Sequence, residues 1–275
     1  MTTTWFITGT SSGFGRLLTE RLLARGDRVA ATLRRPGALD DLRAKYGHRL
    51  WTARLDVTDT DEVRRVVEEA FRALGTIDVV VNNAGYGVLA SVEEASDEQI
   101  RRVVNTNLIG SIQVVRAALP HLRAQGGGRV LQVSTAGGQT TYPGLSYYHA
   151  SKWGIEGFCE TAAREIAPFG IALTIVEPGA TPTNFATSID TAPPLDAYAD
   201  TPAGATRQAV AEGRFPLPNS AEKIADAMID LVDSGATPLR LPLGPDTYDD
   251  VHAALADRLA EHEAHREVAY SVAAG

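Results

Sequence analysis

The amino-acid sequence predicts a doubly wound parallel α/β sheet of about seven strands, with helices on both faces. Short apolar, β-branched runs alternate with helical stretches along most of the chain, an order that is typical of a parallel sheet. Several of these runs end in Gly, Asn, Ser or Thr, as expected where the strands of an open α/β sheet meet a ligand. The 275 residues show no internal repeat or linker, so we expect one domain over residues 1–275.

The composition is that of a soluble globular protein, 44% hydrophobic and 22% charged. A net charge of −8 argues against a general binder of nucleic acid or of anionic membranes. The single cysteine, Cys159, excludes an internal disulfide and is expected to be a small buried apolar residue. No signal peptide and no membrane span of about 18 residues is recognisable, so a cytoplasmic enzyme is expected, and no metal site is predicted.

The first strand is predicted at Thr4–Thr8, and a glycine-rich turn, Gly9–Gly15, joins it to a helix at Arg16–Arg25. Glycines allow the backbone to turn sharply and to approach a pyrophosphate, and a helix N-terminus offers it free N–H groups. A plain turn with a helix cap is the alternative. The position directly after a strand favours nucleotide binding.

The second strand, Arg28–Leu33, is followed by two arginines, Arg34 and Arg35. The residue at this strand end selects between NAD and NADP, because an acid there holds the ribose hydroxyls of NAD. Here Leu33 stands in place of an acid, and an adjacent guanidinium suits the 2′-phosphate of NADP. The alternative is that both arginines are solvated loop charges.

The later elements continue the alternation. The run Ile77–Val81 is almost wholly apolar, as in a strand buried on both faces. It ends at Asn82–Gly85, and Asp56 follows the strand before it, so both are expected at the ligand edge. The remaining elements are predicted as helices 39–46, 61–74, 97–124, a helix carrying Tyr148 that ends near 167, 221–232 and 247–265, and as strands 49–55, 129–133, 171–176 and 239–243.

Poor helix formers interrupt the long helix that a capping box, Ser96 with Gln99, is expected to open. Asn105, Asn107 and Gly110 are disfavoured in a helix interior. They predict either a local distortion that holds a polar group at a site or simple tolerance of these residues.

Tyr148 and Lys152 are four residues apart, so on a helix they lie on one face. A phenol has a pKa near ~10, and a nearby ammonium lowers it. This arrangement can provide a general acid/base for an alcohol oxygen. The same spacing is also common in ordinary surface pairs, so its meaning depends on the other motifs.

The segment 184–218 is rich in Ala, Pro, Thr and Asp and has no clear periodicity. Such a segment is either a functional lid or a disordered insert, and we expect a lid with short helices over the substrate. Five aromatic residues favour an apolar or ring-bearing substrate if they line the pocket, although core positions are the alternative: Tyr142, Trp153, Phe185, Tyr198 and Phe215.

In order and spacing, these motifs resemble the short-chain dehydrogenase/reductase family over residues 4–245. The matching stretches are Thr8–Gly15, Asn82–Gly85, Asn107, Tyr148–Lys152 and Pro178-Gly179. The resemblance implies a Rossmann-like fold. Within the family, residues 148–157 and 235–243 look most like bacterial NADP-using ketone reductases.

The resemblance also assigns catalytic roles. Tyr148 would be the general acid/base, Lys152 would lower its pKa and bind the nicotinamide ribose, and Asn107 would anchor a water in a proton relay. The family places a substrate-orienting serine thirteen residues before the tyrosine, a position that Thr135 occupies here. Threonine keeps the hydroxyl donor but adds a methyl group. Ser134 could serve instead only if the loop register shifts by one residue.

The resemblance also implies contacts to NADP(H) at several regions of the chain. The phosphates would lie on the glycine-rich turn, the 2′-phosphate on Arg34, the adenine beside the third strand, and the nicotinamide against the Pro178 region. The implied cofactor-binding residues are Gly9, Ser12, Gly13, Phe14, Gly15, Arg34, Asp56, Val57, Asn83, Tyr148, Lys152, Pro178, Gly179, Thr181 and Thr183.

The implied activity is the NADP(H)-dependent interconversion of a ketone and a secondary alcohol, a small-molecule substrate. A non-catalytic NADP sensor is the rival from another class, but a sensor needs no proton relay. An epimerase or dehydratase is a second rival, although such relatives usually carry a larger C-terminal domain than residues 247–275 allow. Relatives are commonly homodimers or homotetramers built on the helices that hold Asn107 and Tyr148.

Overall fold

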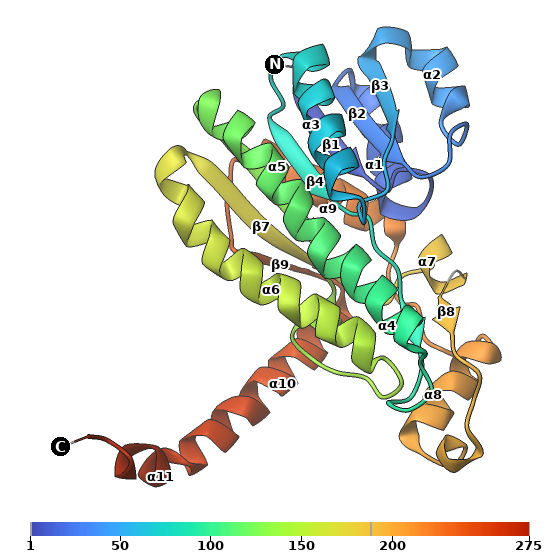
Figure 1. The fold of residues 1–275 in the computed structure, drawn as a ribbon, viewed down its shortest axis with the longest axis vertical. Helices are drawn as coiled ribbons and strands as arrows, with labels where there is room; N and C mark the ends of the chain where they lie inside the picture. The colour runs from blue at the N-terminus through green and yellow to red at the C-terminus, as the bar shows by residue number, and fades with distance from the viewer. Residues whose placement is uncertain (1, 188, 275) are drawn as a thin grey trace.

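Seven parallel strands form one sheet in the order β3-β2-β1-β4-β6-β7-β9 (Figure 1). The structure, a computed structural model, describes residues 2–187 and 189–274. The predicted parallel sheet is therefore confirmed, with boundaries within two residues of those expected. The strands are β1 Thr4–Thr8, β2 Arg28–Leu33, β3 Leu50–Arg54, β4 Val79–Asn82, β6 Gly128–Val133, β7 Ile171–Pro178 and β9 Arg240–Leu243.

Helices cover both faces of the sheet, and alternating strand side chains supply a core on each. In β1, Phe6 packs with α3, α5 and α6, whereas Trp5 and Ile7 pack with α1, α2 and α9. This alternation is why the central strands are apolar throughout. The helices are α1 Gly13–Arg25, α2 Asp40–Tyr46, α3 Thr60–Leu74, α5 Ser111–Ala124, α6 Ser146–Ile166 and α9 Ala221–Asp233.

The chain reverses direction across the sheet between β1 and β4. From β1 it moves to β2 and β3, then returns to β4 and continues outward to β9. Ligands of open α/β sheets bind at the carboxyl ends of the strands next to such a reversal. The glycine-rich turn after β1 and the Asn82–Gly85 stretch after β4 both lie there.

The long helix is distorted where the sequence places Asn and Gly. The Ser96 capping box opens α4, Asp97–Val104, and a π-helical stretch, Asn105–Gly110, separates it from α5. A side chain on Gly110 would begin 2.7 Å from the backbone oxygen of Val57. Of the two alternatives, a local distortion and simple tolerance of these residues, the structure shows the distortion, and this close approach explains the glycine.

The segment 184–218 contains short elements, as expected: α7 Asn184–Thr187 and α8 Pro202–Ala211. Ser188, within this range, lies outside the described residues. A two-stranded parallel sheet, β5 Val88–Leu89 with β8 Asp190–Thr191, was not predicted, because two-residue strands show no periodicity. In Figure 1, α7, β8 and α8 gather near α4 at one end of the sheet.

The chain ends in two helices, α10 Pro245–Ala264 and α11 Arg266–Ser271, which extend away from the sheet (Figure 1). The helix predicted at 247–265 is therefore confirmed as α10, with a break near His265. Across residues 2–187 and 189–274, none of the helices combines the length and apolarity needed to cross a membrane.

Candidate active site

The glycine-rich turn is closely packed against the end of β4. Gly9 has φ of 71°, and a side chain on Gly15 would begin 2.4 Å from the Gly9 oxygen. The Asn83 amide donates to the Thr8 oxygen at 2.8 Å and to the Gly9 oxygen at 3.1 Å. Ser12, the N-cap of α1, makes no side-chain capping bond. The turn thus presents an uncapped helix N-terminus, which suits a phosphate.

Thr8 is a structural residue of this turn to which the sequence analysis assigned no role. Its side-chain oxygen accepts hydrogen bonds from the backbone N–H groups of Asn83, at 2.9 Å, and Ala84, at 3.0 Å. It therefore ties the end of β1 to the end of β4 across the reversal point. The sequence offered one indication of this role, a threonine at the last position of the predicted apolar strand Thr4–Thr8. The structure shows that this threonine is buried.

Arg34 and Asp56 stand at the ends of neighbouring strands. Arg34 is exposed and has no ion pair within the described part of the chain. The Asp56 carboxylate accepts from the Thr58 backbone N–H at 3.0 Å and from its hydroxyl at 2.7 Å. Burial opposes ionisation, but these bonds and the charge of Arg34 lower the pKa of Asp56. Both side chains could meet the adenosine half of a dinucleotide.

Tyr148 is the residue expected to act as the general acid/base. It lies on α6 and is 8% exposed. Burial raises its pKa, and a hydrogen bond with Thr135 opposes that rise. Lys152, one turn further along, is also buried, and its Nζ donates to the Val133 oxygen at 3.0 Å. The structure thus brings Tyr148, Thr135 and Lys152 together at the end of β6.

The expected lowering of the Tyr148 pKa by Lys152 is not found in the protein alone. The Lys152 Nζ lies 5.8 Å from the centre of the tyrosine ring and is bonded to Val133. Burial therefore dominates, and the Tyr148 phenol is held neutral. Burial also lowers the pKa of Lys152 to about 8, with Glu156 opposing.

Two hydroxyl groups follow β6, those of Ser134 and Thr135, and they have different surroundings. Thr135, which bonds with Tyr148, also donates to the Pro178 oxygen at 3.2 Å. Ser134 is 3% exposed, and its hydroxyl has no hydrogen-bond partner among the described residues. It lies beneath Gly138, whose side chain would begin 2.6 Å from it. This arrangement favours Thr135 over Ser134 as the hydroxyl that accompanies Tyr148.

Asn107 connects the π-helical stretch to the catalytic helix. Its amide nitrogen donates to the Tyr86 oxygen at 2.8 Å and to the Ser151 hydroxyl at 3.1 Å. Its amide oxygen accepts from the Tyr86 N–H at 3.1 Å. Since Ser151 lies between Tyr148 and Lys152 on α6, Asn107 fixes the position of this helix. Its role in a water-mediated relay stays a prediction.

The stretch after β7 is held in place by hydrogen bonds to Asp246, in the first turn of α10. The Asp246 carboxylate accepts from the Ala180 N–H at 2.7 Å and from the Asn219 amide at 2.8 Å. A side chain on Gly179 would begin 2.2 Å from this carboxylate, so only glycine fits there. Asp246 and Asn219 were missed, because nothing in their local sequence indicates a distant contact.

Thr181 and Thr183 occupy different positions in this stretch. Thr181 is buried, and its hydroxyl donates to the Gly179 oxygen at 2.8 Å. Thr183 faces the glycine-rich turn, because a side chain on Gly13 would begin 3.8 Å from its Cβ. The stretch after β7 and the turn after β1 therefore lie next to each other.

Of the five aromatic residues expected near the substrate, Phe185 contacts the catalytic group. Its ring centre lies 5.6 Å from that of Tyr148. The side chains of three others contact residues outside this group. The Tyr142 hydroxyl donates to Asp250, the Tyr198 hydroxyl donates to Glu93, and the Trp153 ring packs against the Arg258 guanidinium. Phe215 is partly buried.

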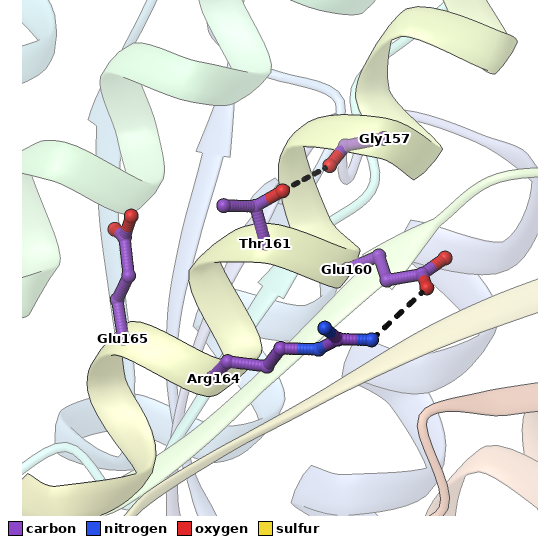
Figure 2. Close-up of a pocket in the computed structure, with 5 residues that line it drawn as sticks. All are labelled: Gly157, Glu160, Thr161, Arg164 and Glu165. Atoms are coloured by element: carbon purple, nitrogen blue, oxygen red, sulfur yellow. Dashed lines mark hydrogen bonds and ion pairs between the residues drawn. The ribbon is translucent and has the colours of Figure 1, made fainter. Parts of the chain in front are cut away.

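A hollow of about 500 Å³ lies along the C-terminal half of α6, and Tyr148 is not among its lining residues (Figure 2). It is lined by Gly157, Glu160, Thr161, Arg164 and Glu165. Thr161 bonds back to Gly157, and Arg164 pairs with Glu160. These are ordinary contacts within one helix, so the hollow is not the candidate active site.

Comparison with known proteins agrees with this geometry. The family model of the short chain dehydrogenases matches residues 3–194. Oxidoreductase BOA17 of Botryotinia fuckeliana is 37% identical over 274 residues, which cover 99% of this chain and 100% of the relative. The crystal structure of a short-chain dehydrogenase from Streptomyces avermitilis is 38% identical, with a TM-score of 0.92 and 100% coverage of both chains.

A further solved structure is that of a short-chain dehydrogenase from Burkholderia cenocepacia in complex with NADP. It is 25% identical, with a TM-score of 0.75, and the match covers 95% of this chain and 96% of that one. The region that the family model matches, residues 3–194, contains the glycine-rich turn, Asn107, Tyr148 and Lys152. The chain therefore belongs to the short-chain dehydrogenase family of oxidoreductases.

Proposed function

We propose that the chain is an NADP(H)-dependent oxidoreductase that interconverts a ketone and a secondary alcohol. The observation that carries this proposal is the convergence of Tyr148, Thr135 and Lys152 at the end of β6. Two hydroxyls that face one another at a sheet edge can hold one carbonyl oxygen, and a buried lysine beside them can compensate a developing negative charge.

The residues at the sheet edge fit a bound dinucleotide. The turn at Gly9–Gly15 and the uncapped N-terminus of α1 would hold its pyrophosphate, Asp56 its adenine and Arg34 its 2′-phosphate. When bound, the nicotinamide would exchange a hydride with the carbonyl carbon of the substrate. The relative from Burkholderia cenocepacia, solved with NADP, supports this cofactor class.

Tyr148 and Thr135 would act on the substrate oxygen. In ketone reduction both hydroxyls donate hydrogen bonds to that oxygen, and Tyr148 transfers its proton to it as negative charge develops. Burial keeps Tyr148 neutral, which is the form an acid requires. The Lys152 ammonium would stabilise the phenolate that remains. Alcohol oxidation reverses these steps.

Tyr148→Phe tests the proposal. Turnover of a ketone panel with NADPH should fall by about 10²- to 10⁴-fold, because the proton donor is lost. The dissociation constant of NADPH, followed by nicotinamide fluorescence, should stay nearly unchanged. Tyr147→Phe is the matched control, because the Tyr147 hydroxyl bonds to the Val92 oxygen instead. Retained turnover in Tyr148→Phe would contradict the assignment.

An apolar or ring-bearing substrate is the class we propose, supported by the Phe185 ring beside Tyr148. We also propose a homodimer or homotetramer built on α5 and α6. Ile109, which leads into α5, is 42% exposed, as an interface residue of an isolated chain would be. Light scattering after size-exclusion chromatography measures the mass, and a monomer at micromolar concentration would contradict the oligomer.

A further inference from the structure

The C-terminal helix α10 contacts the loop 137–142, which lies between β6 and α6 in the chain. The Asp250 carboxylate accepts a hydrogen bond from the Tyr142 hydroxyl at 2.7 Å. About two turns further along α10, the Arg258 guanidinium donates to the Gln139 backbone oxygen at 2.7 Å. These contacts join residues that are 108 and 119 positions apart in the chain, and the mechanism proposed above uses neither of them.

The part of α10 that carries Asp250 is itself fixed on both sides. One turn before Asp250, the Asp246 carboxylate accepts from a backbone N–H of the stretch after β7 at 2.7 Å. Val251, the next residue, is 7% exposed. Beyond it, the Arg258 guanidinium lies 4.9 Å from the centre of the Trp153 ring of α6. Asp250 therefore offers the loop an acceptor whose position is set by the body of the protein.

Tyr142 also bonds to the catalytic helix, through His149. The Nε2 of His149 accepts from the Tyr142 backbone N–H at 2.9 Å, and its Nδ1 donates to the Gly137 oxygen at 2.7 Å. The His149 ring centre lies 5.6 Å from that of Tyr142 and 5.9 Å from that of Tyr148. The loop thus begins two residues after Thr135 and ends against the neighbour of Tyr148, so it connects the two residues proposed to hold the substrate oxygen.

We propose that Asp250 is a positioning residue of the active site, which acts through Tyr142 on the loop between Thr135 and the catalytic helix. The inference rests on the proposed function, in which Thr135 and Tyr148 act on one oxygen. Burial, together with the carboxylate of Asp250, raises the pKa of Tyr142, so its hydroxyl keeps the proton that it donates.

The expected effect follows from the geometry that two converging hydroxyls require. A displacement of about 1 Å in a group that orients the substrate costs up to about 100-fold in rate. Thr135 has a second contact, to the Pro178 oxygen at 3.2 Å, which limits how far it can move when the loop is released. We therefore expect about a tenfold loss.

Asp250→Ala and Tyr142→Phe each remove the bond. The turnover number should fall about tenfold, measured with the ketone that the wild type reduces fastest and counted per NADPH-binding site. Counting by sites, from the fluorescence titration, separates mispositioning from a loss of folded protein. The KM for the ketone should change less than the turnover number, because these hydroxyls act mainly in the transition state. A turnover number within twofold of wild type in both variants would overturn the proposal.

Two further variants separate the hydrogen bond from the presence of the side chain. Asp250→Asn keeps an oxygen that can accept from Tyr142, so it should restore turnover to within about threefold of wild type. Asp249→Ala is the matched control, because Asp249 is exposed on the same helix. If Asp250→Asn were as slow as Asp250→Ala, the bond to Tyr142 would not be the cause.

The double variant Tyr142→Phe/Asp250→Ala tests whether both residues act through the same contact. Its turnover number should equal that of either single variant within about twofold, because the second substitution removes a bond that is already lost. Losses that multiply to about 100-fold would mean that the two residues act separately, and would overturn the proposal.

Hydrogen exchange followed by mass spectrometry tests the same contact without cofactor or substrate. Peptides that cover 136–145 should exchange at least about tenfold faster in Asp250→Ala and in Tyr142→Phe, whereas peptides from β4 should be unchanged. Tyr142→Phe removes a single oxygen atom and keeps the inference testable if Asp250→Ala does not fold. Unchanged exchange of the loop would overturn the proposal, and this outcome is separate from that of the Tyr148→Phe test.

Discussion

The two sides of the active site are held by different kinds of contact. On the cofactor side, backbone groups and short side chains bond across neighbouring strand ends, as Thr8 and Asn83 do. On the side of the segment 189–218, which we propose to be a lid, long charged side chains bridge segments far apart in the chain. The Glu94 side chain, 1% exposed, pairs with Arg207 of α8, which lies 113 residues further on. The first kind of contact tolerates almost no added atoms, whereas the second can open without disturbing the sheet.

A second ion pair, close to the Glu94–Arg207 pair, also joins the proposed lid to the rest of the chain. Arg102 of α4 pairs with Asp190 of β8, and the Gln99 amide donates to the same carboxylate at 3.0 Å. Glu94 also accepts from the Leu195 backbone N–H at 2.9 Å. The lid is therefore attached at its two ends, by β8 and by α8, to the segment around α4.

Gly15→Ala should distort the glycine-rich turn on the cofactor side, and we expect it to have the largest effect of the substitutions discussed here. The new methyl group would lie 2.4 Å from the Gly9 oxygen and 2.7 Å from the Asn83 amide, so the turn must shift. We expect NADPH binding, measured by fluorescence titration, to weaken by at least about 100-fold, or about 2.8 kcal/mol.

Gly157→Ala on α6 is the control for this change. An added methyl group there meets nothing within 4 Å, so a gain of up to about 1 kcal/mol in helix stability is expected. If Gly15→Ala bound NADPH as tightly as Gly157→Ala does, the close-packed turn would not be the phosphate site.

Arg207→Ala should remove the Glu94–Arg207 ion pair, and we expect the effect to be confined to the proposed lid segment. The substitution leaves Glu94 without its cation, and breaking a buried pair costs about 3–5 kcal/mol if the remaining charge stays buried. Opening the lid hydrates Glu94 instead, so the free energy of global unfolding should change little. Limited proteolysis within 189–218 should become at least about tenfold faster.

Arg214→Ala removes an exposed pair with Glu212 from the same segment and should leave the cleavage rate unchanged. A large drop in the melting temperature of Arg207→Ala, without faster lid cleavage, would contradict the separation of the two sides.

The cofactor side depends on contacts between neighbouring elements, and the proposed lid depends on contacts between distant segments. This difference also determines which features could be predicted from the sequence. The positions of the strands, the glycine-rich turn and the Tyr148–Lys152 pair follow from local periodicity and spacing, because each depends on neighbours within one or two elements. The distortion at Asn107 was expected for the same reason. The Thr135 position followed from the family resemblance, which places a substrate-orienting hydroxyl thirteen residues before the tyrosine.

The contacts that were missed join distant residues. Asp246 meets the backbone after β7 across 66 residues, and the small β5–β8 sheet joins segments about 100 residues apart. Acidic residues are common on surface helices, so no local pattern marks Asp246 as a ligand of a backbone N–H. The raised pKa of Tyr148 was missed as well, because burial depends on how α6, Phe185 and β6 pack together.

Arg34→Ala sharpens the comparison on the cofactor side without disturbing the turn. Arg34 is exposed and unpaired in the described ranges, so removing it should leave the fold intact. Losing a charge-assisted bond to a phosphate costs about 1.5–3 kcal/mol, or about 10- to 100-fold in the dissociation constant of NADPH. NADH binding should change less than twofold. Arg35→Ala is the control, and equal losses for both cofactors in Arg34→Ala would defeat the 2′-phosphate assignment.

The smallest expected effect concerns His149, which anchors the loop 137–142 on the substrate side. Its Nδ1 donates to the Gly137 oxygen at 2.7 Å, and its Nε2 accepts from the Tyr142 N–H at 2.9 Å, so the ring is neutral. Burial lowers its pKa below the usual value near ~6.5. The unfolded chain therefore binds a proton at a higher pH than the folded one, and this stabilising contribution, present above pH ~6.5, is lost as the pH falls.

Urea unfolding at pH 7.5, 6.5 and 5.5 measures that loss. One such group changes the unfolding free energy by no more than about 1.4 kcal/mol per pH unit. His149→Asn keeps a polar side chain that does not titrate, so its stability should fall less steeply over this range than that of the wild type. Since the carboxylates titrate alike in both proteins, the difference in slope belongs to His149. Equal slopes would mean that the neutral imidazole does not hold this loop.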